Sequence, residues 1–370
     1  MAEAQIVFDL GTVLQTGAAL GASDIILMSG KPPMARVNGQ VAPIQGLPPL
    51  PAEQCQALIY SGMQGNLRAR FEADWELDYS LSIQNVSRFR VNVLTQRSGL
   101  AAVYRVIPAQ IPEPEALGLT PEMIAVTDLP RGLVIVTGPT GSGKSTTLAS
   151  LMERINQKYR KSIITIEDPI EFVYECKNSL IMQREVGQHT KSFKEALRRA
   201  LREAPDVIMV GEMRDLETIQ LAVTAAETGH LCFATLHTQD CASSVARMID
   251  VFPPGQQEQI RTQLSLTLQA VIAQVLLPGV TGQGRVAARE FMTLTSAIGN
   301  MIRENKSHMI YSALEAGKKF GMMTMDQDLA ALAAAGKVRM QDALTKALSP
   351  EDVKRLMSML IAQKTGQPQP

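Results

Sequence analysis

The stretch of sequence that decides the fold is Gly138-Pro139-Thr140-Gly141-Ser142-Gly143-Lys144-Ser145. It fits the phosphate-binding pattern G-x-x-x-x-G-K-S/T at every required position. An apolar run at 133–136 precedes it, and residues 146–156, which follow it, have the pattern of a helix. Because the motif needs a strand before it and a helix after it, this context outweighs the alternative of a chance glycine turn. The chain is expected to bind a nucleoside triphosphate.

The residues of this loop have distinct expected roles. Glycines let the backbone approach phosphate oxygens closely, and the N–H groups at the start of the helix favour anions. Lys144 is expected to reach the β- and γ-phosphates, and the Ser145 hydroxyl to bind Mg²⁺. The predicted nucleotide-binding residues of the loop are Gly138, Thr140, Gly141, Ser142, Gly143, Lys144, Ser145 and Thr146.

Composition limits the class of protein. The 370 residues, of which 45% are hydrophobic, suffice for one large or two ordinary domains. Lys+Arg and Asp+Glu balance at 36 each, and only 4% of residues are aromatic. Both values argue against a nucleic-acid motor, since proteins that bind single strands use basic grooves and aromatic stacking platforms.

The start of the chain, its apolar runs and its cysteines indicate in which cellular compartment the protein is expected. The start is acidic where a secretory signal is basic, and no apolar run reaches the ~18 residues that cross a bilayer. The four cysteines form no C-x-x-C pair, which argues against a disulfide framework or a zinc ribbon. We expect a cytoplasmic protein without direct membrane insertion, which could still dock on a membrane protein.

The chain divides into zones of different pattern. Residues 1–107 combine a helix at 12–21 with strand patterns at 22–27, 35–41, 75–83, 87–94 and 100–107, which predicts an α+β domain. Prolines 108, 112 and 114 predict a linker over 108–121.

The rest of the chain predicts an α/β fold. Residues 122–290 contain four continuous apolar runs, which are typical of a parallel sheet covered on both faces. These runs are 133–137, 163–166, 207–210 and 231–234. A long helix is expected over 256–277, and residues 291–370 are expected to form a helical C-terminal region.

Polar residues follow each of the four predicted strands. The phosphate loop follows the first strand, residues 167–171 the second, Glu212 the third and His237 the fourth. Because ligands bind at the carboxyl ends of the strands of a parallel sheet, these residues should converge on one pocket.

Each of these polar residues has a candidate role. Glu212 ends an apolar strand and is expected to hold Mg²⁺, the alternative being an ordinary polar strand end. Glu171 is the choice for orienting the attacking water, and Glu167 with Asp168 for supporting the metal shell, the alternative being a solvated acidic loop. His237 could sense the γ-phosphate. His230 lies roughly 23 Å away along the strand, so the two histidines cannot share a metal ion, and a structural role is expected for His230.

Two groups of arginines could deliver charge to phosphates. Arg198, Arg199 and Arg202 lie on an expected helix and form either a solvated basic face or a contact to the phosphates of a neighbouring subunit. Arg90, Arg97 and Arg105 in the N-terminal strands raise the same question. An arginine supplied in trans to a phosphoryl-transfer site can raise the rate by orders of magnitude.

Together these residues resemble the secretion ATPase superfamily and, within it, the retraction ATPases of type IV pili, the motors of twitching motility. The resemblance spans nearly the whole chain. It rests on the segments Ile166-Glu167-Asp168-Pro169-Ile170-Glu171-Phe172, Val210-Gly211-Glu212-Met213-Arg214-Asp215, and Thr228-Gly229-His230 to Leu236-His237-Thr238, which correspond to the Asp box, Walker B and His box.

The resemblance implies a homohexameric ATPase that uses Mg²⁺. Each subunit would pair a PAS-like N-terminal domain with a RecA-like core, with ATP between them and N-terminal arginines completing the site. The family implies Glu171 as the catalytic glutamate, Glu212 as the Walker B acid and His237 as a phosphate contact. It also implies a place at the inner-membrane base of the pilus, with the pilus platform protein as partner and a paralogous pilus ATPase as a further candidate.

Two features distinguish members of the superfamily. Assembly and secretion ATPases usually add a long N-terminal extension and a four-cysteine zinc module, and this sequence carries neither pattern, which favours retraction. Retraction ATPases carry Ala-Ile-Arg-Asn-Leu-Ile-Arg-Glu near the C-terminus, where this chain has Ala297-Ile298-Gly299-Asn300-Met301-Ile302-Arg303-Glu304. Gly299 replaces the first arginine, so an accessory retraction ATPase or a low-turnover, nucleotide-dependent scaffold remains the alternative.

Overall fold

The computed structural model describes residues 8–37, 39–84, 86–107, 110–282 and 284–365. The chain forms two compact units. The first contains Met1–Gln110 together with Pro169–Val173, and the second contains Ile111–Asp168 together with Tyr174–Pro370. Pro108 and Ala109 of the expected linker lie outside the described residues, and the remainder of that segment belongs mostly to the second unit, where the Ser150 hydroxyl donates to the carbonyl of Pro112.

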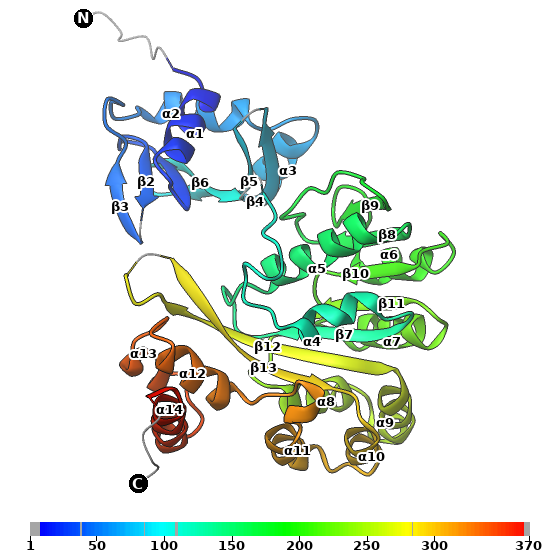
Figure 1. The fold of residues 1–370 in the computed structure, drawn as a ribbon. Helices are drawn as coiled ribbons and strands as arrows, with labels where there is room; N and C mark the ends of the chain where they lie inside the picture. The colour runs from blue at the N-terminus through cyan, green and yellow to red at the C-terminus, as the bar shows by residue number, and fades with distance from the viewer. Residues whose placement is uncertain (1–7, 38, 85, 108–109, 283, 366–370) are drawn as a thin grey trace, which may run out of the picture. The chain divides into compact units, whose positions relative to one another are not determined.

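The first unit is the α+β domain that the alternating patterns predicted. Its six strands form one antiparallel sheet in the order β3-β2-β1-β6-β5-β4. The helices α1 and α2 lie on one face of this sheet (Figure 1). The elements are α1 (Leu10–Ala19), β1 (Asp24–Met28), β2 (Met34–Val37), β3 (Gln40–Pro43), α2 (Ala52–Ser61), α3 (Leu67–Asp74), β4 (Glu76–Ile83), β5 (Ser87–Gln96) and β6 (Gly99–Ile107).

Side-chain alternation explains why this sheet has one buried face. On β5, Phe89, Val91 and Val93 are fully buried, whereas Arg90 between them is partly exposed. Successive side chains of a strand point to opposite faces, so the apolar set packs under α1 and α2 and the polar set faces away.

The second unit is built on a seven-stranded sheet in the order β13-β12-β7-β11-β10-β8-β9. All neighbouring pairs are parallel except β12 and β13. The four predicted strands are confirmed as β7 (Gly132–Thr137), β8 (Ser162–Glu167), β10 (Val207–Val210) and β11 (Leu231–Thr235). The pattern did not predict β9 (Leu180–Glu185), β12 (Leu268–Pro278) and β13 (Arg285–Thr293).

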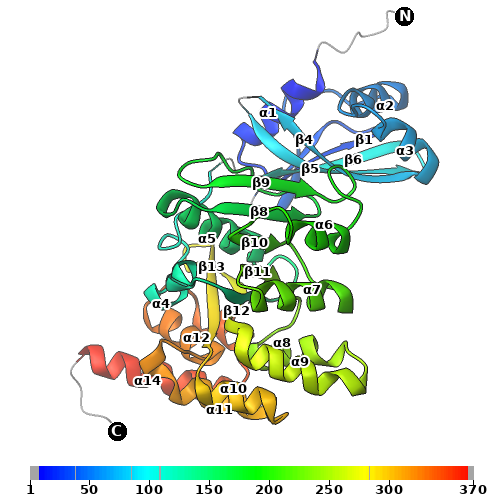
Figure 2. The ribbon, with the colours of Figure 1, turned by 90° about the vertical axis from the view of Figure 1, so that its right-hand side faces the viewer.

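Helices cover both faces of this sheet, as the continuous apolar strands required (Figure 2). Leu133 and Ile135 of β7 pack in one core with side chains of the helices α6 to α11, while α5 lies on the other side of the sheet. The helices with their bounds are α4 (Pro121–Ile124), α5 (Lys144–Lys158), α6 (Phe193–Ala200), α7 (Leu216–Glu227), α8 (Cys241–Asp250), α9 (Pro254–Thr267), α10 (Ser296–Arg303) and α11 (Ile310–Ala316).

The prediction of a long helix over 256–277 is wrong for the second half of that segment. The helix α9 ends at Thr267, and β12 begins at Leu268. The spacing of Val271 and Val275 fits a helix, but every residue of 270–273 is buried, which is the signature of a strand enclosed on both faces. A short apolar run of this kind does not distinguish a buried strand from a buried helix by periodicity alone.

The C-terminal helices form a small core of their own on the β12–β13 hairpin. Leu277 of β12 and Ala288 of β13 pack with Leu329 and Val353 of two of these helices. The elements are α12 (Met325–Ala334), α13 (Met340–Leu344) and α14 (Pro350–Thr365). The expected helices at 324–335 and 349–363 are confirmed, whereas the hairpin strand β13 extends into the region that was expected to be helical.

Candidate functional site

Strand register brings most of the predicted site residues to one edge of the sheet. Val136 of β7 lies beside Thr235 of β11, and Val210 of β10 lies between Ala234 of β11 and Ile166 of β8. The phosphate loop, His237 and Glu212 follow three of these strands, and Glu167 is the last residue of β8. They therefore lie in that order along adjacent strand ends, as the sequence predicted.

The phosphate loop has a conformation that requires glycine. Gly138 has φ 141°, and a Cβ there would lie 2.2 Å from the backbone oxygen of Gln274. Gly141 and Gly143 are left-handed, at φ 78° and 87°, and α5 begins directly after Gly143. The loop therefore turns tightly and directs the free N–H groups of the first turn of α5 toward its concave side.

The polar groups of the loop fit a triphosphate. Lys144 is only 9% exposed, and its Nζ donates to the backbone oxygens of Gly138 at 2.8 Å and Pro139 at 3.1 Å. The Ser142 hydroxyl is buried and has no hydrogen-bond partner among the described residues. Ser145 is exposed. An ammonium group held within the loop, an unused buried hydroxyl and a helix N-terminus are the donors that phosphate oxygens accept.

The Glu212 side chain links the end of β10, which it follows, to His237 at the end of β11. Its Oε1 accepts from Nε of Arg214 at 2.6 Å, and its Oε2 lies 3.3 Å from Nε2 of His237. Glu212 is mostly buried, while Arg214 is mostly exposed. The predicted Walker B acid and the predicted phosphate-sensing histidine are thus in direct contact.

Glu167 is buried and oriented by its neighbours. The hydroxyl of Thr165 donates to its Oε1 at 2.6 Å, and Nε2 of Gln183 on β9 donates to the same oxygen at 3.2 Å. Asp168, the next residue, is exposed. An ordered buried carboxylate beside Glu212 suits the supporting role predicted for Glu167 in a metal shell.

Glu171 belongs to a different compact unit from Glu167, Glu212 and His237. Pro169–Val173 belongs to the first compact unit, whereas the strand before it, β8, belongs to the second. The segment after β8 therefore runs from one unit into the other and back. The part predicted for Glu171 in hydrolysis stays a prediction.

The structure divides the three N-terminal arginine candidates. Arg90 lies directly opposite Arg105 in the β5–β6 pair, so both side chains share the face of the sheet away from the helices. Nε of Arg105 is 3.1 Å from Oδ1 of Asp24. Arg97 lies in the turn at the other end of the hairpin, seven residues or up to roughly 23 Å from Arg90 at the usual rise of a strand. Arg90 and Arg105 therefore lie side by side on the sheet and Arg97 lies apart from them, while the part predicted for each arginine at the nucleotide stays a prediction.

His230 and the basic residues near α6, for which the sequence suggested roles, have contacts with nearby residues. The Nδ1 of His230 lies 3.0 Å from the carbonyl oxygen of Ala225, which fits the structural role expected for it. Arg198, Arg199 and Arg202 are exposed, on α6 and just after it, and Arg198 pairs with Glu195 at 3.5 Å. These exposed positions agree with the interpretation that the three arginines form a solvated basic face.

Gly299 has a packing role that the sequence did not reveal. It is buried in α10, and a Cβ there would lie 3.1 Å from the carbonyl oxygen of Ser265 in α9. That distance is tighter than an ordinary contact, so the missing side chain lets the two helices approach closely.

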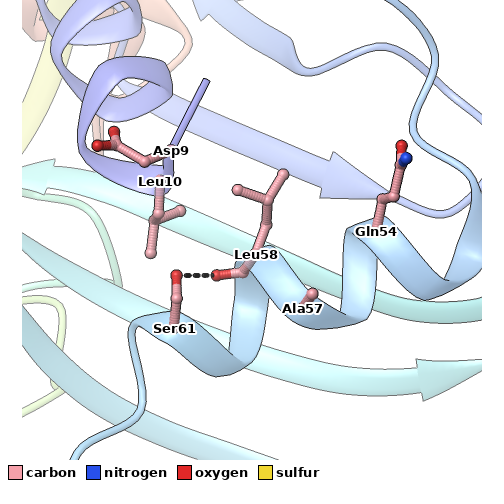
Figure 3. A pocket seen from close by; sticks show the side chains of 6 residues that line it. All are labelled: Asp9, Leu10, Gln54, Ala57, Leu58 and Ser61. Atoms are coloured by element: carbon pink, nitrogen blue, oxygen red, sulfur yellow. Dashed lines mark hydrogen bonds between the residues drawn. The ribbon is translucent and has the colours of Figure 1, made fainter. Parts of the chain in front are cut away.

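A cavity of about 270 Å³ lies in the first unit, between the start of α1 and α2 (Figure 3). Leu10, Ala57 and Leu58 give it an apolar lining. Two of its polar side chains make local hydrogen bonds: the Asp9 carboxylate accepts from the N–H of Thr12, and the Ser61 hydroxyl donates to the carbonyl of Leu58. The residues that line this cavity belong to the first unit, whereas the strand-end site belongs to the second.

A parallel sheet with a glycine loop after one strand and a carboxylate after another defines a P-loop nucleotide-binding protein. Comparison with known proteins identifies the family. The family described as Type II/IV secretion system protein matches residues 68–281, more than half of the chain. The chain therefore belongs to this family.

Within this family, the chain is similar to ATPases of type IV pili. The chain is 51% identical to the type IV pilus retraction ATPase PilT of Pseudomonas aeruginosa over 93% of this chain and 99% of that protein. It is 39% identical to the type IV pilus ATPase PilU of the same organism, over 92% and 88% of the two chains. A crystal structure of the pilus retraction motor PilT with bound ADP matches with a TM-score of 0.88 and 45% identity, covering 94% of this chain and 99% of that one.

Proposed function

We propose that this protein is an ATP-hydrolysing motor that powers the retraction of type IV pili in twitching motility. One observation supports it most: the phosphate loop, Glu167, Glu212 and His237 meet on adjacent strand ends, in a chain 51% identical to a retraction ATPase over almost its whole length. The ADP-bound relative supports a nucleotide as the ligand of the loop.

Each residue of the site has a part in this proposal. Lys144 turns from the loop carbonyls to the phosphates, and the buried Ser142 hydroxyl donates to a phosphate oxygen. Ser145 and Glu212 would hold Mg²⁺, with Glu167 in support, and the bound ion would supply charge that neutralises the phosphate oxygens. Glu171 orients the attacking water, and His237 reports the state of the γ-phosphate to Glu212.

The assembly proposed for the motor is a homohexamer. Subunits in a ring would let Arg90 and Arg105 of the N-terminal unit reach a nucleotide, which is how an arginine supplied in trans stabilises transferring phosphates. The partner would be the pilus platform protein at the cytoplasmic side of the inner membrane, and a paralogous pilus ATPase is a second candidate.

Among the described residues, no helix has both the length and the apolar character needed to cross a bilayer.

Two substitutions test the assignment of the site. Lys144→Ala should abolish steady-state ATP turnover by the purified protein, and Glu171→Gln should retain bound ATP without hydrolysing it. Lys346→Ala, at an exposed lysine of the C-terminal region, is the matched control and should turn over normally. Normal hydrolysis by both site variants would refute the assignment.

The alternative is an accessory ATPase or a low-turnover scaffold. The departure at Gly299 motivates it, whereas the higher identity to PilT than to PilU argues for the main retraction motor. A complementation experiment distinguishes the main motor from the alternatives. In a strain that lacks its retraction ATPase, a main motor expressed by itself restores twitching, whereas an accessory ATPase or a scaffold expressed by itself does not.

A further inference from the structure

Gln274 of β12 is a buried polar residue beside the phosphate loop. It is 1% exposed, and its amide makes two buried hydrogen bonds. Nε2 donates to the backbone oxygen of Ser142 at 2.7 Å, and Oε1 accepts from the hydroxyl of Thr147 at 2.9 Å. Ser142 lies in the loop and Thr147 in the first turn of α5, so one side chain joins the two. The four residues between them include Lys144 and Ser145.

Gln274 also contacts the beginning of the loop. A Cβ on Gly138 would lie 2.2 Å from the backbone oxygen of Gln274, and one on Gly143 would lie 3.2 Å from its Nε2. These contacts follow from the register of the sheet, in which Ala273 of β12 lies beside Thr137 of β7. Both ends of the loop therefore rest on the same residue of the neighbouring strand.

The two hydrogen bonds require the chemistry of a glutamine amide. A backbone carbonyl only accepts, so the atom facing Ser142 has to be a donor, and the atom facing the Thr147 hydroxyl accepts its proton. An ionised glutamate has no donor for the Ser142 carbonyl. Asparagine is one methylene shorter and cannot span the same gap. Methionine has a similar length and shape but makes neither bond.

We propose that Gln274 is a positioning residue for nucleotide binding. It holds the loop and the first turn of α5 in one arrangement, so that the backbone that carries Lys144 and Ser145 is in place before the nucleotide arrives. This inference rests on the proposed ATPase function. Without the amide, the loop has to be ordered at the moment of binding, and two buried polar groups lose their partner, which should weaken nucleotide binding by about ten-fold.

The first experiment measures ADP affinity by titration calorimetry and steady-state ATP turnover for Gln274→Met. Its control is Gln269→Met, the same change on the same strand but beside Gly132, away from the loop. The expected result, measured on folded protein, is an ADP Kd and an ATP KM about ten-fold higher for Gln274→Met than for the control, together with a lower thermal unfolding midpoint because two buried polar groups lose their partner. A residue with only a structural role would lower the midpoint and leave the Kd of the folded protein unchanged, which would overturn the proposal.

Two further variants keep the test decisive if Gln274→Met does not fold. Thr147→Val removes one of the two bonds, and it should also weaken ADP binding, by less than Gln274→Met. In Gln274→Glu, a protonated carboxyl can donate to the Ser142 carbonyl and an ionised one cannot. ADP affinity of this variant should therefore recover relative to wild type as pH falls from about pH 8 toward pH 6, since burial raises the pKa of a carboxyl.

The outcomes separate this inference from the proposed function. If wild-type protein neither binds ADP nor hydrolyses ATP, the proposed function fails and the positioning role fails with it. If wild-type protein binds ADP and the variants at Gln274 and Thr147 bind it equally well at every pH, the ATPase assignment stands and the positioning role is wrong.

Discussion

Glu290 of β13 offers a quantitative test of how the helices around the site are held. Its side chain is 2% exposed, its Oε1 accepts from the N–H of Cys241 at 2.8 Å, and its Oε2 accepts from the N–H of Met325 at 3.4 Å. Cys241 begins α8, which follows the loop carrying His237, and Met325 begins α12. One carboxylate thus accepts one N–H at the start of each of two helices, in addition to the caps from Asp240 and Thr324.

The expected loss of stability follows from these two bonds. A hydrogen bond to a charged acceptor contributes about 1.5–3 kcal/mol, and the bond at 3.4 Å belongs at or below the bottom of that range. Glu290→Ala removes both bonds and leaves a cavity, so the free energy of unfolding should fall by about 3–5 kcal/mol. Glu290→Gln keeps an acceptor for Cys241 and turns an N–H toward Met325, so it should lose only about 1–2 kcal/mol.

The pH dependence of the Gln variant has a definite sign. Burial raises the pKa of Glu290, and the hydrogen bonds from Cys241 only partly oppose this. The folded protein therefore binds the proton more tightly than the unfolded chain. The contribution to stability is complete below the ordinary pKa of a glutamate and is lost as pH rises through the raised pKa of the folded state. Gln does not titrate, so the deficit of Glu290→Gln relative to wild type should shrink as pH rises above about pH 4.5.

Urea unfolding followed by circular dichroism at several pH values measures both effects. Glu258→Gln, at an exposed glutamate of α9, is the control for the loss of one charge. Hydrogen exchange at the amides of Cys241 and Met325 should become faster in Glu290→Ala. Unfolding of Glu290→Ala at the urea midpoint of the control, or a Glu290→Gln deficit that grows with pH, would refute this account.

Three further predictions concern backbone and packing. Gly138→Ala should abolish ADP binding in a calorimetric titration, because the new Cβ would meet a backbone carbonyl of β12 at 2.2 Å. Gly299→Arg should lower stability by about 1–3 kcal/mol through overpacking against Ser265, whereas Ala297→Arg, at an exposed position of the same helix, should leave the thermal unfolding midpoint unchanged. Trp75 is 69% exposed and has φ 64°, so Trp75→Gly should relieve strain and raise stability by about 0.5–1 kcal/mol in thermal unfolding.

Local patterns predicted the elements whose signal lies within one segment. The alternating strands β4, β5 and β6 and the continuous apolar strands β7, β8, β10 and β11 were all anticipated. The patterns failed where two structures share one signal, as in β12, where a buried run after a true helix matched both a helix and a strand. They also left β13 unpredicted, because its apolar side chains become buried only when β12 lies beside it.

The candidate site divides in the same way. The phosphate loop and the carboxylates after the strands could be read from the sequence, since each follows an apolar run and the strand-end rule places them together. Gln274 had no signal, because it lies 130 residues beyond Lys144 in the chain (274 − 144) and is indistinguishable from any other glutamine until the sheet places β12 beside β7.

The sequence by itself determined that this chain has a phosphate loop, a parallel sheet and the motifs of a secretion ATPase, because glycine spacing and strand composition are local properties. The tertiary structure decided that Glu212 contacts His237, that Arg90 and Arg105 share a sheet face while Arg97 does not, that Gly299 is a packing residue and that Gln274 supports the loop. These facts depend on register and on the approach of distant backbones, which arise only when the long-range contacts of the sheet and helices are formed.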